Sequence, residues 1–94
     1  MRLRYTPQAR RDIDGIADYI AERNPAAAQR VGDRIRRTAV ILSEFPLIGH
    51  PGKLPGTQEF VVAGLPYIIV YRIERERDRG IIVVGVHHGA RDRR

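Results

Sequence analysis

The residues whose types could support chemistry gather near the end of this 94-residue chain. His87 and His88 are adjacent, and Arg91 follows them in a basic tail. Histidine titrates near neutral pH and can donate or accept a proton, while an arginine can stabilise the charge that develops on a phosphate. With Glu59 as a base from an earlier segment, this set could cleave RNA by acid–base chemistry. The alternative is that one histidine faces solvent and the other packs on the helix layer.

Other patterns for catalysis or ligand binding find little support in the sequence. The chain has no cysteine, and its one serine, Ser43, has no histidine at helical spacing. In the segment GHPGKLPG (residues 49–56) neither a Ser or Thr nor a helix follows the lysine, as a phosphate-binding loop requires. His87 and His88 would point to opposite faces of a strand, so one metal ion would not take both. We therefore expect no metal and no cofactor.

Arginine dominates the charge of the chain. Lys plus Arg number 17 against 11 acids, which gives a formal net charge of +6, and Lys53 is the only lysine. Arginine makes planar, forked contacts with carboxylates and phosphates, and a basic balance of this size favours an anionic partner. The sequence therefore predicts a nucleic acid or an acidic protein as partner, unless the arginines form only a solvated surface.

Length and hydropathy indicate a small soluble domain. The 94 residues fit one domain, residues 1–94. No apolar run approaches the roughly 20 residues that span a bilayer, and residues 1–7 lack the apolar stretch of a signal peptide. The absence of cysteine suits a reducing compartment. We expect a cytoplasmic protein without a membrane partner.

Two amphipathic helices are expected after a short strand at residues 2–5. Thr6-Pro7 and Asn24-Pro25 each combine an N-cap residue with a proline at the first helical position. Apolar residues then recur at helical spacing: Ala9, Ile13, Ile16, Ala17 and Ile20 in the first helix, and Ala28, Val31, Ile35, Thr38, Ala39 and Leu42 in the second. Because the turn between them is short, the helices should pack as an antiparallel hairpin.

Three strands are expected in the second half of the chain, at 57–62, 67–73 and 81–88, because these segments are rich in β-branched and aromatic residues. Residues 46–56, with three prolines and three glycines, are expected to form a loop. The order β-α-α-β-β-β predicts an α+β fold, an antiparallel sheet with an αα-hairpin packed on one face. Its predicted core is apolar, and consists of Ile13, Ile16, Ile20, Val31, Ile35, Leu42, Ile69, Tyr71, Val84 and Val86.

Three motifs in this order resemble a known family. They are PGKLPGTQEFVV (residues 51–62), PYIIVYR (66–72) and VHHGAR (86–91), and they are similar to the ParE branch of the ParE/RelE toxins. The resemblance extends over nearly the whole chain, and it implies the same β-α-α-β-β-β order. It also implies an acidic, ParD-like antitoxin, which lays an amphipathic helix on the hairpin and an extended segment along the sheet.

The sequence departs from the ribosome-dependent nucleases of the superfamily at positions that are catalytic in those enzymes. The resemblance places Ile68 where RelE-type nucleases carry a catalytic arginine, and only Arg91 matches a RelE catalytic position. Glu59 and His88 could imitate two catalytic residues of a YoeB-like relative. The resemblance therefore favours the branch that poisons DNA gyrase, without enzymatic activity of its own. The alternatives are a ribosome-dependent mRNA endoribonuclease, and a decayed toxin that only binds its antitoxin.

Two surfaces are predicted to bind partners. We expect Arg91, Arg93 and Arg94, supported by His87 or His88, to contact gyrase or its DNA. On the second helix, arginines at i, i+4 and i+7 should line one face and meet acidic residues of the antitoxin; they are Arg30, Arg34 and Arg37. The alternative for these three is a solvated helix face.

Overall fold

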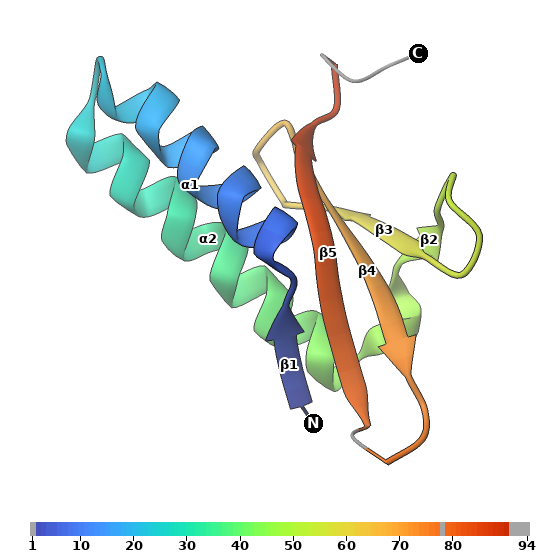
Figure 1. Cartoon of the computed structure of the whole chain (residues 1–94). Helices are drawn as coiled ribbons and strands as arrows, with labels where there is room; N and C mark the ends of the chain where they lie inside the picture. The colour runs from blue at the N-terminus through green and yellow to red at the C-terminus, as the bar shows by residue number, and fades with distance from the viewer. Residues whose placement is uncertain (1, 78, 91–94) are drawn as a thin grey trace.

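A computed structural model describes residues 2–77 and 79–90 of the chain (Figure 1). The elements are β1 (Arg2–Tyr5), α1 (Pro7–Ala21), α2 (Pro25–Glu44), the 3-10 helix η1 (Pro46–Ile48), β2 (His50–Pro51), β3 (Gln58–Val61), β4 (Tyr67–Glu74) and β5 (Gly80–His88). The α+β class and the predicted order of the main elements are confirmed. The segment expected to be a loop, 46–56, also contains η1 and the short strand β2.

Both helices begin where their capping residues predict. The Thr6 side-chain oxygen accepts a hydrogen bond from the backbone N–H of Ala9 at 3.1 Å, and the Asn24 side-chain oxygen accepts one from Ala27 at 3.0 Å. Proline occupies the first turn of each helix, where no intrahelical donor is lost. The two helices form the expected hairpin, which packs against the β1 and β5 side of the sheet (Figure 1).

The sheet is mixed rather than antiparallel throughout. Its five strands have the order β1-β5-β4-β3-β2, and β1 runs parallel to β5 while the other pairs are antiparallel. The direction of β1 could not be predicted, because no turn joins it to a neighbouring strand. Gly80 allows the close approach: its φ is 150°, and a Cβ there would lie 1.8 Å from the carbonyl oxygen of Arg2.

A β-bulge in β5 changes which of its residues face the helices. Val70 pairs with Gly85 but Tyr71 pairs with Val83, so Val84 has no partner on β4. Val83 and Val86 are therefore both buried although they are three residues apart, and Val84 is only half-buried. The prediction that Val84 belongs to the core was wrong, since one extra residue reverses the alternation of side chains along a strand.

Side chains of α1 and its cap hold the bulge. A carboxylate oxygen of Asp12 (Oδ2) accepts a hydrogen bond from the backbone N–H of Val86 at 3.0 Å. The Thr6 hydroxyl donates to the carbonyl of Val84 at 3.3 Å, and the Thr6 N–H donates to the carbonyl of Val83 at 3.0 Å. Backbone groups of β5 at and beside the bulge thus find partners on Thr6 and Asp12.

The core lies between the hairpin and the sheet. Of the predicted core residues, Ile13, Ile35, Leu42, Ile69, Tyr71 and Val86 are buried, and Ile16, Ile20 and Val31 pack half-buried against them. The Tyr71 hydroxyl donates to the carbonyl of Pro46 at 2.7 Å, which ties η1 to the sheet. Burial raises the pKa of the Tyr71 phenol, so this group remains a donor at neutral pH.

Truncating Ile35 tests the packing of α2. Its side chain is 1% exposed, whereas that of Ile41, on the same helix, is 48% exposed. We expect Ile35→Ala to lower the free energy of unfolding by about 2–5 kcal/mol because it leaves a cavity. The control Ile41→Ala should change it by less than about 0.5 kcal/mol. Denaturant unfolding measures both, and equal losses would contradict the orientation of α2.

Candidate functional site

The histidines at the end of β5 line a cleft against α1. The cleft holds about 500 Å³, and Arg11 and Tyr19 of α1 face Tyr67 and both histidines across it. Tyr19 is 56% exposed, so an aromatic surface is open to a partner here. The cleft combines a cation, aromatic rings and imidazoles, which suits contacts with a protein or nucleic-acid surface more than enclosure of a small substrate.

The strand register separates the two histidines. His88 pairs with Tyr67 and His87 with Ile68, so the two side chains lie on opposite faces of the sheet. The ring of His88 meets that of Tyr67 edge-on, with centroids 5.5 Å apart and an interplanar angle of 89°. The Nδ1 atom of His88 accepts a hydrogen bond from the N–H of Ala90 at 3.2 Å. These contacts hold the ring of His88 on the side of the helices.

The strand register separates Glu59 from His88, two of the residues proposed for a nuclease. Glu59 pairs with Val70, three positions along β4 from Tyr67, and therefore lies on the face opposite to His88. Its Oε2 accepts a hydrogen bond from the backbone N–H of Lys53 at 3.2 Å, within its own hairpin. Ile68, where the resemblance would place a catalytic arginine, is aliphatic and half-buried. Arg91, the third member of the set, lies outside the described residues.

The arginines of α2 gather as predicted. Arg30, Arg34 and Arg37 are exposed and line one groove of about 340 Å³, with Leu65 on its far side. We call this the α2 groove; it lies between α2 and the turn that joins β3 to β4. The guanidinium of Arg34 donates to the carbonyl of Ala63 in that turn. One arginine is thus held across the groove.

The one acidic residue among these arginines, Asp33, does not pair with Arg37, although the i,i+4 spacing would allow it. Its carboxylate lies 3.6 Å from Arg36, at i+3. The Nε of Arg37 instead donates to the backbone carbonyl of Asp33 at 3.5 Å. The Asp33 carboxylate is therefore engaged on the other side of the helix, and Arg37 keeps its charge toward the α2 groove.

Sequence reasoning missed an apolar extension of the α2 groove. Ile41 and Phe45 continue the spacing of the three arginines by one and two further turns, and they are 48% and 60% exposed. Leu47 in η1 is 71% exposed. The sequence does contain a sign of this apolar surface, because apolar residues at these positions interrupt the polar face of an amphipathic helix. The surface along α2 thus changes from cationic to apolar.

The described part of the chain offers no other obvious chemistry. Among residues 2–77 and 79–90 no group of three or more His, Cys, Asp or Glu could hold a metal ion. No helix in these ranges is both long and apolar enough to cross a membrane. Arg93 and Arg94, predicted to contact the target, lie outside the described residues as Arg91 does.

The two-helix hairpin on one side of an open, mixed sheet is an α+β architecture, as the resemblance to the ParE/RelE toxins implies. The family model for the ParE toxin of type II toxin–antitoxin system, parDE, matches residues 3–93, so the chain belongs to the ParE toxin family. The resemblance of the three sequence motifs to this family is thereby confirmed, and the chain is a toxin of the type II toxin–antitoxin class.

Two relatives agree with this assignment, and one solved structure shares the fold. "Putative toxin Y4kP" of Sinorhizobium fredii is 45% identical over 75 residues, which cover 80% of this chain and 78% of the relative. "Toxin RelE2" of Caulobacter vibrioides is 33% identical over 87 residues, 93% of each chain. The structure titled "Chromosomal ParDE TA system from P. aeruginosa" matches with a TM-score of 0.81 at 21% identity, over 94% of this chain and 95% of that one, and supports the fold.

Removing the carboxylate of Asp12 tests how the cleft is positioned. In Asp12→Ala the backbone N–H of Val86 loses its acceptor, which should cost about 1–3 kcal/mol of unfolding free energy. Amide exchange at Val86 should also become faster. Asp18→Ala, an exposed carboxylate on the same helix, is the matched control. If both variants lose the same stability and exchange at Val86 is unchanged, Asp12 does not hold the bulge.

Proposed function

We propose that this toxin acts in the cytoplasm by inhibiting DNA gyrase, that it thereby arrests growth, and that an acidic, ParD-like antitoxin neutralises it. In this proposal the protein is a binding protein and not an enzyme. Its target surface comprises the cleft at the end of β5, with His87 and His88, together with Arg91, Arg93 and Arg94. Its antitoxin surface is the α2 groove, with Arg30, Arg34 and Arg37.

The observation that carries the proposal is the separation of Glu59 from His88 by the sheet. General acid–base catalysis requires both groups within hydrogen-bond reach of one reacting phosphate. Side chains on opposite faces cannot meet that condition without rearrangement of the strands. With an aliphatic residue at Ile68, no described side chain at that position supplies the cation that the transition state needs. A binding mode of action needs neither arrangement.

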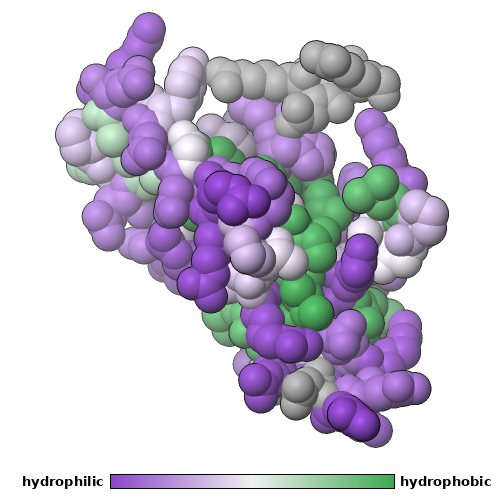
Figure 2. All heavy atoms as spheres, in the orientation of Figure 1, coloured by the Kyte–Doolittle hydropathy of each residue, from purple (hydrophilic) through white to green (hydrophobic). Residues whose placement is uncertain are grey.

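The α2 groove suits an amphipathic, acidic segment. Its arginines present cations over about two turns of α2, while Ile41 and Phe45 present apolar surface beyond them. A partner helix with carboxylates toward one end and apolar side chains toward the other would match both parts. Figure 2 also shows an apolar band over β4 and β5, bordered by hydrophilic residues. An extended segment of the antitoxin could cover this band.

The similarity to a protein named "Toxin RelE2" favours a second candidate, a ribosome-dependent mRNA endoribonuclease. In that case His88 would act with Arg91, and the ribosome would supply the groups that the chain lacks. A third candidate is a toxin whose only remaining activity is binding to its antitoxin. The three candidates differ in what the purified protein does to gyrase and to translating ribosomes.

Two parallel assays distinguish these candidates. Purified protein with gyrase and plasmid should accumulate cleaved plasmid, and translating ribosomes with mRNA should show no codon-positioned cuts. Prior mixing with the antitoxin should abolish the gyrase effect. Codon-positioned cuts that disappear in His88→Ala would establish the nuclease instead. Activity in neither assay, with intact antitoxin binding, would leave the third candidate.

Truncation after Gly89 tests the basic tail. The shortened chain lacks Arg91, Arg93 and Arg94, whose contacts with phosphates or carboxylates would support target binding in a salt-dependent way. We expect growth arrest to be lost and antitoxin affinity to change little, because the α2 groove is intact. Growth curves after induction measure the first quantity and titration calorimetry the second. A truncated chain that still arrests growth would show that the target binds elsewhere.

Removing two arginines tests the α2 groove. In Arg30→Ala/Arg34→Ala the association rate with the antitoxin should fall by about tenfold at low salt, since steering by complementary charge is lost. The rate should also depend less on salt than in the wild type, whose steering is screened over about 8–10 Å at physiological ionic strength. Arg36→Ala, on the opposite side of α2, is the matched control. An unchanged rate and salt dependence in the double variant would place the antitoxin on the sheet instead.

A further inference from the structure

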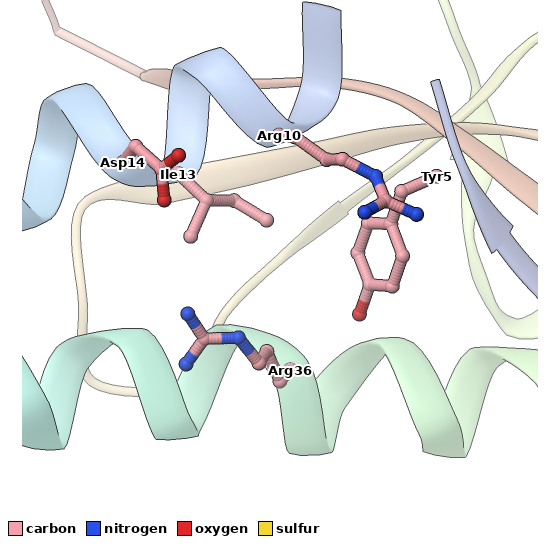
Figure 3. Close-up of a pocket in the computed structure, with 5 residues that line it drawn as sticks. All are labelled: Tyr5, Arg10, Ile13, Asp14 and Arg36. Atoms are coloured by element: carbon pink, nitrogen blue, oxygen red, sulfur yellow. The ribbon is translucent and has the colours of Figure 1, made fainter. Parts of the chain in front are cut away.

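Two further arginines, one from each helix, line a cavity away from the α2 groove. Arg36 of α2 and Arg10 of α1 line a cavity of about 380 Å³ where the two helices meet the end of β1. Tyr5, Ile13 and Asp14 complete its lining (Figure 3). We call this space the seam cavity. Neither the motifs shared with the family nor the proposed binding of antitoxin and gyrase makes use of it.

The packing of the hairpin leaves this space open. Gly32 lies one turn before Arg36, and a Cβ on Gly32 would lie 3.1 Å from the Nη1 atom of Arg36. The guanidinium of Arg36 therefore lies over the position that a larger side chain would fill. Ile13, which is buried, forms an apolar wall on the side of α1. The result is a cavity with an apolar wall and cationic edges.

Most hydrogen-bond donors around the seam cavity have no protein partner within the described residues. The Tyr5 hydroxyl and the Arg10 guanidinium make no hydrogen bond or ion pair there, and Arg36 has only Asp33, with Nη1 3.6 Å from its carboxylate. Figure 3 shows the guanidinium of Arg10 beside the ring of Tyr5 and that of Arg36 across the gap. Burial raises the pKa of Tyr5 more strongly than Arg36 and Arg10 lower it, so the phenol stays protonated and can donate.

We propose that the seam cavity binds an oxyanion, either a phosphoryl or a carboxylate group, between Arg10, Arg36 and the hydroxyl of Tyr5. Two guanidinium groups offer forked donors that fit the paired oxygens of such a group better than a spherical halide. The organic part of the ligand would lie against Ile13. Asp14 sits beyond Ile13 from Tyr5 in Figure 3, and its carboxylate opposes the anion and limits the affinity.

This site is separate from the antitoxin surface because of its place on α2. Arg36 and Arg37 are neighbours in sequence, but successive helical residues point about 100° apart, and they line different cavities. An anion in the seam cavity would contact α1, α2 and β1 together. It would thus stabilise the folded toxin by binding to the native state alone.

Titration with simple anions at constant ionic strength tests the proposal. Inorganic phosphate and acetate are each added to the full-length protein, with sodium chloride as the reference salt, and binding is followed by amide chemical shifts and by the unfolding temperature. As phosphate, acetate or both are added, the amide chemical shifts of residues 5, 10, 13, 14 and 36 should change and then reach a plateau. The unfolding temperature should also rise above that in chloride. Which of the two binds more tightly identifies the preferred ligand class.

Three variants make the assignment specific. Arg36→Gln should weaken anion binding by about tenfold, as expected for loss of one charged hydrogen-bonding group. Asp14→Asn should strengthen it, because the opposing charge is removed. Arg37→Gln, the matched control, should leave it unchanged. If neither anion exceeds chloride in its effect, or if Arg36→Gln and Asp14→Asn bind as the wild type does, the proposal is wrong.

Discussion

The hydrogen bond between the Asp12 carboxylate and the backbone N–H of Val86 is the contact on which the arrangement of this toxin depends. It joins the first helix to the last strand at the point where the β-bulge interrupts the ladder. The bulge makes Val83 and Val86 both face the core, and the side chain of His88 lies on the same face as Val86 and Tyr67. Without the extra residue, the alternation of a regular strand would exchange the faces of the two histidines. This local irregularity therefore decides which histidine side chain lies on the side of α1, although residues 87 and 88 both border the cleft.

Helix α2 divides the surface of the hairpin into two regions. On one side Arg30, Arg34 and Arg37 border the α2 groove, and on the other Arg36 borders the seam cavity. The buried side between them packs on the sheet through Ile35 and Leu42. Arginines lie on both exposed sides of α2, so the positive charge of this helix is divided between two separate surface regions. The groove and its extension combine cationic and apolar surface, whereas the seam cavity is lined by two guanidinium groups and a phenol.

Much of the fold could be predicted from the sequence because its signals are local. Thr6-Pro7 and Asn24-Pro25 place both helix starts, and apolar spacing identifies Ile13, Ile35 and Leu42 as core. The direction of β1 and the bulge at Val84 depend on contacts between segments nearly 80 residues apart, such as Thr6 with Val84, and no local pattern reveals them. For the candidate site, helical spacing predicted that Arg30, Arg34 and Arg37 share a surface. It could not reveal that Glu59 and His88 lie on opposite faces, since that follows from the register of three strands.

The proposed docking of an acidic antitoxin on the arginines of α2 can be examined by a charge-reversal scan. Arg34→Glu is combined in turn with replacement of each acidic residue of the antitoxin by arginine, and the dissociation constant of every pair is measured. We expect Arg34→Glu to weaken the complex and one reversal to restore it, with a coupling energy above about 1.5 kcal/mol, as for close charge pairs in other interfaces. Arg36→Glu should leave the affinity unchanged. If no reversal restores binding, or if Arg36→Glu weakens the complex as strongly as Arg34→Glu, the antitoxin does not dock on these arginines.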